Sequence, residues 1–132
     1  MVFGVFDGLH KGHHVFLNQA KRCGTYLIVA VTRDHNVRKL KGRLPKKGFR
    51  VRVRHLKKVD GVDKVVGGDK ALSTYGVLRK YKPDIVVIGY DQRVFKRDLE
   101  KHIRRTGLKI KLKIARPYKP KTHHSSLLRG VS

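Results

Sequence analysis

The chain has 132 residues, a length that suits a single core, so we expect residues 1–132 to form one domain. Its 33 Lys and Arg against 9 Asp and Glu give a net charge of +24, yet 39% of the residues are hydrophobic and fall in regular blocks, which argues against a disordered chain. The single cysteine, Cys23, excludes an intrachain disulfide and favours the cytoplasm, while the short apolar runs and the opening residues exclude a membrane span and a signal peptide.

Strand-like and helix-like segments alternate along the chain. Buried strands read as continuous apolar runs, such as TYLIVAVT, whereas LKIKLKIA alternates with period two and suits an edge strand. Predicted helices end at Gly or before Pro. In chain order we predict strand Met1–Phe6, helix Gly12–Cys23, strand Thr25–Thr32, basic loop Arg33–Lys47, helix Phe49–Lys58, strand Asp63–Val66, helix Ala71–Tyr81, strand Asp84–Gly89, helix Lys96–Thr106, edge strand Leu108–Ala115, loop Pro117–His124 and helix Ser125–Gly130.

This alternation predicts an α/β fold, a Rossmann-like parallel sheet with helices on both faces. In such sheets ligands bind beyond the carboxyl ends of the strands, at the point where the strand order reverses. The segments that follow the strands are therefore the candidate site: residues 6–14, 32–41, 89–93 and 116–126.

The charge balance has two interpretations. Glu100 is the only glutamate, and helix faces read Lys and Arg where Glu is common. One hypothesis is an ordinary enzyme whose surface was shifted to positive charge by engineering or selection; the other is a naturally basic nucleic-acid binder. Either way we expect non-specific binding of polyanions.

The segment GVFDGLHKGHH, residues 4–14, carries the most specific chemistry. It joins a strand to the start of a helix, where free backbone N–H groups and the helix dipole favour a phosphate. His10 and His13 are three residues apart, so both imidazoles face one spot and can donate hydrogen bonds to oxygens that gain charge. A chance histidine-rich turn is one alternative, and a zinc site using Asp7, His10 and His13 is another, although zinc needs three or four converging ligands.

This segment resembles the signature of the cytidylyltransferase-like nucleotidyltransferases. The stretches TRDHNVRKLKGRLP, VDKVVGGDK, KPDIVVIGYDQ and YKPKTHHSS extend the resemblance over nearly the whole chain and make it most similar to archaeal-type FAD synthases. The resemblance implies an enzyme that joins ATP to FMN, with Mg²⁺, to give FAD and pyrophosphate, and it implies a homodimer. Glycerol-3-phosphate or sugar-phosphate cytidylyltransferases, which use CTP, share the skeleton and remain an alternative, as does a non-catalytic scaffold or nucleic-acid binder on the same fold.

Site residues follow from the resemblance position by position. His10 and His13 match catalytic positions, and Asp7 sits where a carboxylate helps to place either the metal or the first turn. Nucleotide contacts match Val5, Phe6, His10, Lys11, Gly12, His13, Asp91, Tyr118, Ser125 and Ser126. Phosphate or acceptor contacts match Lys39, Lys41 and Arg52. Other roles stay open: solvated charge for Lys39 and Lys41, turn or helix capping for Asp91, Ser125 and Ser126, and structural contacts for Arg52.

Overall fold

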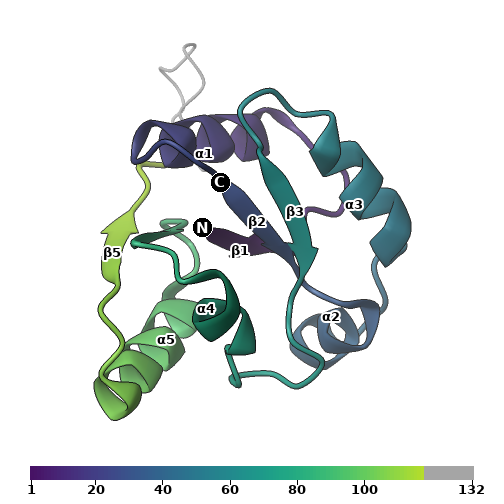
Figure 1. The fold of residues 1–132 in the computed structure, drawn as a ribbon. Helices are drawn as coiled ribbons and strands as arrows, with labels where there is room; N and C mark the ends of the chain where they lie inside the picture. The colour runs from purple at the N-terminus through teal and green to yellow at the C-terminus, as the bar shows by residue number, and fades with distance from the viewer. Residues whose placement is uncertain (118–132) are drawn as a thin grey trace.

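The computed structural model describes residues 1–117, in which each strand is joined to the next through one or two helices (Figure 1). The strands are β1 (Val2–Gly4), β2 (Ile28–Val31), β3 (Lys64–Gly67), β4 (Ile85–Ile88) and β5 (Lys111–Ile114). The helices are α1 (Lys11–Arg22), α2 (Asp34–Lys41), α3 (Phe49–Lys57), α4 (Gly76–Tyr81) and α5 (Arg93–Thr106). The predicted loop at 117–124 and helix at 125–130 lie almost entirely outside the described residues.

All strand pairings are parallel, and they place the point of reversal between β1 and β4. The ladders join β1 to β2, β2 to β3, and β4 to β5. The amino group of Met1 donates to the carbonyl of Ile85 (2.8 Å), and the Val87 N–H donates to the carbonyl of Met1 (3.0 Å), so β4 lies beside β1. The spatial order is therefore β3-β2-β1-β4-β5, which confirms the Rossmann-like prediction.

The core has two parts, one on each face of the sheet. Leu17 of α1 and Leu56 of α3 pack with Val29 on one face, whereas Leu78 of α4 and Leu99 of α5 pack on the other. Every residue of β2 is at most 9% exposed, as expected of a strand covered on both faces. Within residues 1–117, no helix is long and apolar enough to cross a membrane.

The predicted basic loop at Arg33–Lys47 is wrong, because α2 occupies its first half. The helix buries Asn36 and Val37 and ends at Gly42, which adopts a left-handed conformation (φ 75°). Only residues 42–48 remain a loop. The sequence suggested a loop because the last turn of α2 is basic and its buried face is only two residues long.

The helix predicted at Ala71–Tyr81 is also shorter than expected. Residues 71–75 form a loop, because the Asp69 carboxylate accepts hydrogen bonds from the N–H groups of Gly76 and Val77 and so fixes the start of α4 there. By contrast, α5 begins at Arg93, three residues earlier than predicted. The edge position expected for the alternating segment is confirmed, since in the described part of the chain β5 pairs with β4 alone.

Candidate functional site

A pair of histidines caps the start of α1, directly beyond the carboxyl end of β1. The Gly12 N–H donates to Nδ1 of His10 (3.0 Å), and the His10 N–H donates to Nδ1 of His13 (3.3 Å). These reciprocal bonds form a capping box, and the two rings stack with their centroids 3.9 Å apart. The structure therefore brings together the two side chains that the sequence predicted to face one spot.

The hydrogen bonds also fix which nitrogens are free to bind a ligand. In each ring Nδ1 accepts a backbone N–H, so a neutral imidazole carries its proton on Nε2. Desolvation, followed by the nearby His10 and His14, lowers the pKa of His13 to about 4. His13 is therefore neutral at pH 7, and its Nε2–H is a hydrogen-bond donor at the N-terminal end of a helix, where anions are favoured.

The backbone before the histidines is shaped by close approaches. Phe6 has a positive φ (53°), is 5% exposed, and its ring centroid lies 5.5 Å from that of His13. A Cβ added at Gly12 would lie 2.9 Å from Cε1 of His10, so the His10 ring folds over a position that only glycine leaves free. Lys11, the first residue of α1, is exposed.

Arg52 of α3 is fully buried, and its guanidinium donates hydrogen bonds to four other residues. Its Nε donates to the carbonyl of Lys47 (2.9 Å), and its Nη1 donates to the carbonyls of Val5 (2.8 Å) and Thr32 (2.8 Å). Its Nη2 forms an ion pair with Asp34 (2.6 Å). The side chain is 0% exposed, and its observed contacts are of the structural kind that the sequence left open as an alternative to a phosphate contact. The guanidinium ties the ends of β1 and β2 to the loop between α2 and α3.

Asp7 uses both carboxylate oxygens to hold the same loop. Oδ2 accepts from the N–H of Lys46 (2.8 Å) and Oδ1 from the N–H of Lys47 (2.9 Å). Although desolvation acts in the opposite direction, these two bonds lower the pKa of Asp7. Asp7 is thus observed in the positioning role that the sequence offered for it, and among residues 1–117 no three His, Cys, Asp or Glu side chains converge as metal ligands would.

Other predicted residues gather less tightly around the histidines. Asp91, which follows β4, is exposed, and its charge raises the pKa of His13 against the effect of desolvation. The charge of Lys41, at the end of α2, lowers the pKa of His13. Lys39 is exposed on the same helix. The predicted contacts of Tyr118, Ser125 and Ser126 lie outside the described residues.

Gln92 is a residue of this site that the sequence reasoning missed. Its Oε1 accepts from the Gly89 N–H (2.7 Å), and its Nε2 donates to the carbonyl of Phe3 (3.0 Å). One side chain therefore joins the carboxyl ends of β4 and β1, where the strand order reverses. The motif GYDQ contained the signal, but only Asp91 was selected from it.

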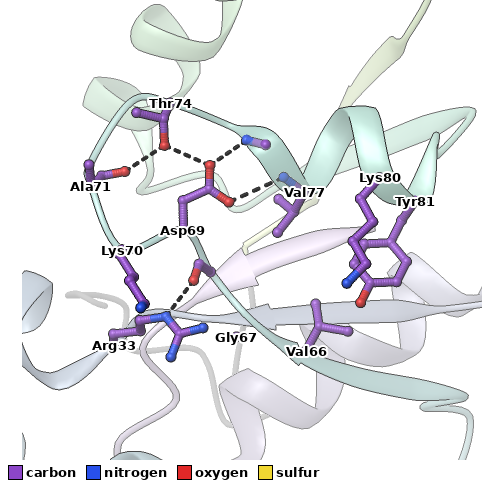
Figure 2. A pocket seen from close by; sticks show the side chains of 12 residues that line it. Arg33, Val66, Gly67, Asp69, Lys70, Ala71, Thr74, Val77, Lys80 and Tyr81 are labelled. Atoms are coloured by element: carbon purple, nitrogen blue, oxygen red, sulfur yellow. Dashed lines mark hydrogen bonds between the residues drawn. The ribbon is translucent and has the colours of Figure 1, made fainter.

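A pocket lies between β3, the segment that follows it and α4 (Figure 2). Its volume is about 560 Å³, and its wall combines the apolar Val66 and Val77 and the ring of Tyr81 with the basic Arg33 and Lys80. Figure 2 shows Asp69 holding the rim, since its carboxylate accepts from the Thr74 hydroxyl (2.6 Å) and from two backbone N–H groups of α4. Sequence reasoning did not predict this pocket, for which the glycines that follow the strand were the available indication.

Comparisons with known proteins agree with one another. A family model described as cytidylyltransferase-like matches residues 1–130. The chain is 41% identical over 118 residues to the FAD synthase of Pyrococcus abyssi, covering 89% of this chain and 79% of that protein. It is 38% identical over 112 residues to the FAD synthase of Aciduliprofundum boonei, covering 85% and 74%. The crystal structure of a lipopolysaccharide core biosynthesis protein from Thermoplasma volcanium superposes with a TM-score of 0.83 at 31% identity, over 90% of this chain and 96% of that one.

Proposed function

Since the chain belongs to the cytidylyltransferase-like family of nucleotidyltransferases, we propose that it joins ATP to FMN, giving FAD and pyrophosphate. The observation that carries this proposal is the stacked pair His10 and His13 at the start of α1, whose Nε2 atoms have no hydrogen-bond partner within residues 1–117. The identity to proteins named FAD synthase favours ATP and FMN over CTP and another phosphorylated acceptor.

The chemistry is a direct nucleotidyl transfer. An oxygen of the FMN phosphate attacks the α-phosphorus of ATP, the new P–O bond forms, and the bond from the α-phosphorus to the bridging oxygen breaks. The electron pair leaves with pyrophosphate. His10 and His13 donate hydrogen bonds to phosphate oxygens that gain negative charge, and α1 aligns the triphosphate for in-line attack.

Mg²⁺ would supply charge neutralisation of the triphosphate. The described part of the chain does not offer a cage for it, because Asp7 is engaged by two backbone N–H groups. We therefore expect the metal to enter on the phosphates of the nucleotide.

The pocket beside β3 is the proposed site of the flavin ring. Its volume of about 560 Å³ falls in the range of small-molecule sites, and Val66, Val77 and Tyr81 offer apolar faces to an aromatic ring. With the nucleotide between β1 and β4, we expect the acceptor phosphate to approach the histidines from this pocket.

The test is a pyrophosphate-release assay with ATP or CTP against FMN, glycerol 3-phosphate and sugar phosphates. We expect release with ATP and FMN, and we expect His10→Ala or His13→Ala to lower kcat by about 10²-fold or more, the effect of losing one donor to a developing charge. His14→Ala is the matched control, because His14 is an exposed neighbour on the same helix. Turnover of both variants within a few-fold of the parent would refute the catalytic roles, and release only with CTP would favour the alternative.

A further inference from the structure

The side-chain amide of Gln92 takes the place of a backbone hydrogen bond between β1 and β4. We propose that Gln92 is a spacer between β1 and β4, and that it sets the width of the crevice that receives the nucleotide. The nucleotide part of this inference rests on the proposed function, whereas the spacer itself is a property of the sheet. Gln92 is thus a positioning residue.

The hydrogen bonds along β1 and β4 show where the Gln92 amide replaces a backbone hydrogen bond. The amino group of Met1 donates to Ile85 and the Val87 N–H donates to Met1, as in a regular parallel pair. Two residues further along each strand, the corresponding bond would run from the Gly89 N–H to the carbonyl of Phe3. Instead, both groups bond to the amide of Gln92, at 2.7 Å and 3.0 Å.

The inserted Gln92 amide must increase the distance between β1 and β4. Neighbouring strands lie about 4.8 Å apart when one hydrogen bond joins them. An inserted amide replaces that single bond by two bonds in series and adds roughly one further hydrogen-bond length, about 3 Å. The sheet therefore stays closed at Met1 and opens toward its carboxyl end, between the histidines that follow β1 and Asp91 that follows β4.

The backbone around Gln92 holds the spacer in place. The Gln92 N–H donates to the carbonyl of Gly89 (3.0 Å), and the Gln92 carbonyl accepts from the Lys96 N–H (3.0 Å), so the residue is fixed by a tight turn on one side and by α5 on the other. A Cβ at Gly89 would lie 3.0 Å from Oδ1 of Asp91 and 3.2 Å from Oε1 of Gln92. Glycine at this position leaves room for the bridging amide.

The bridge needs one acceptor and one donor on the same side chain, which leads to a specific test. An ionised glutamate can accept from Gly89 but cannot donate to the carbonyl of Phe3. A protonated glutamate can do both. Gln92→Glu should therefore be defective at high pH and recover as the pH falls, whereas Gln92→Leu should be defective at every pH.

A control for the added charge exists elsewhere in the chain. Asn18 is an exposed amide side chain on α1, outside the segments named above as the candidate site. Asn18→Asp exchanges an amide for a carboxylate without touching the ends of β1 and β4.

The experiment measures ATP affinity by calorimetry between pH 8 and pH 5, always as the ratio of variant to parent. At pH 8 we expect Gln92→Glu and Gln92→Leu to weaken ATP binding about tenfold or more, with Asn18→Asp unchanged. The deficit of Gln92→Glu should be smaller at pH 5 than at pH 8, because a larger fraction of its carboxyl is protonated there. Parent-like affinity of Gln92→Leu at pH 8 would overturn the role in nucleotide binding.

The spacer is tested separately, without nucleotide, by NMR. In Gln92→Ala the strands should close, so that the Gly89 N–H donates directly to Phe3 and a through-hydrogen-bond coupling appears that the parent lacks. If the coupling does not appear, the amide does not hold the strands apart. This readout is unaffected by failure of the proposed function, which would show instead as a parent that binds neither ATP nor CTP.

Discussion

Replacing Arg52 by Met tests whether this arginine stabilises the backbone around the site or binds phosphate. Met keeps the apolar volume but removes all four hydrogen bonds, three of which run to backbone carbonyls. A buried acceptor left without its partner costs about 1–3 kcal/mol, and breaking a buried ion pair costs about 3–5 kcal/mol. Because the side chain of Asp34 is 43% exposed and regains water, we leave out the ion-pair term and expect a loss set by the three carbonyls, about 3–5 kcal/mol.

The assay is urea unfolding at pH 7 followed by circular dichroism. Arg50→Met is the control, because Arg50 is exposed on the same helix and its loss should change stability by less than about 0.5 kcal/mol. Arg52→Lys should fall between the two, since one ammonium can satisfy only part of the guanidinium's partners. A loss below about 1 kcal/mol for Arg52→Met, together with a raised KM for ATP, would refute the structural role and restore the phosphate contact.

Four further predictions concern acid stability, the acceptor, assembly and charge. The pKa values of His13 and of His102 are lowered in the folded state, foremost by desolvation, so the unfolded chain binds protons more readily and the free energy of unfolding should fall from about pH 6.5 to pH 4. His102 is 5% exposed, and neither ring nitrogen has a hydrogen-bond partner among the described residues, so His102→Leu should show a smaller fall in the urea midpoint. Tyr81→Leu should raise the KM for FMN severalfold and leave that for ATP unchanged, with the exposed Tyr26→Leu as control; equal changes in both KM values would contradict the pocket assignment. Light scattering at moderate salt should show a homodimer, and a species with the mass of one chain would disprove it. Between about 50 and 200 mM salt, affinity for an unrelated 20-mer RNA should fall by orders of magnitude while ATP affinity changes far less, because RNA releases many more counterions; RNA binding that persists, without ATP binding, would make the basic surface the function.

The sequence predicted the layout of the fold because strands covered on both faces leave a plain apolar signal. β2 is the best example, since all its residues are buried and its run of apolar letters could hardly be a surface element. The signal failed at α2, whose buried face consists of Asn36 and Val37 alone. Asp34 in its first turn and Gly42 at its end were the available indications of that helix.

The site was predictable in part for a related reason. His10 and His13 sit on one helix, so their spacing alone brings them together. Arg52 and Gln92 act between segments distant in sequence: Arg52 reaches Val5, and Gln92 reaches Phe3. No local pattern encodes which carbonyl a long polar side chain will contact. Sequence reasoning therefore left the role of Arg52 open and missed Gln92.

The alternation of Lys and apolar residues on β5 has a consequence for the behaviour of concentrated solutions. Lys111 and Lys113 are exposed on a strand that, within residues 1–117, pairs on one side only. Two such strands meeting edge to edge bring like charges together, which discourages aggregation. A polyanion that neutralises these lysines removes this protection, so nucleic acid carried through purification should promote precipitation of the protein rather than keep it dispersed.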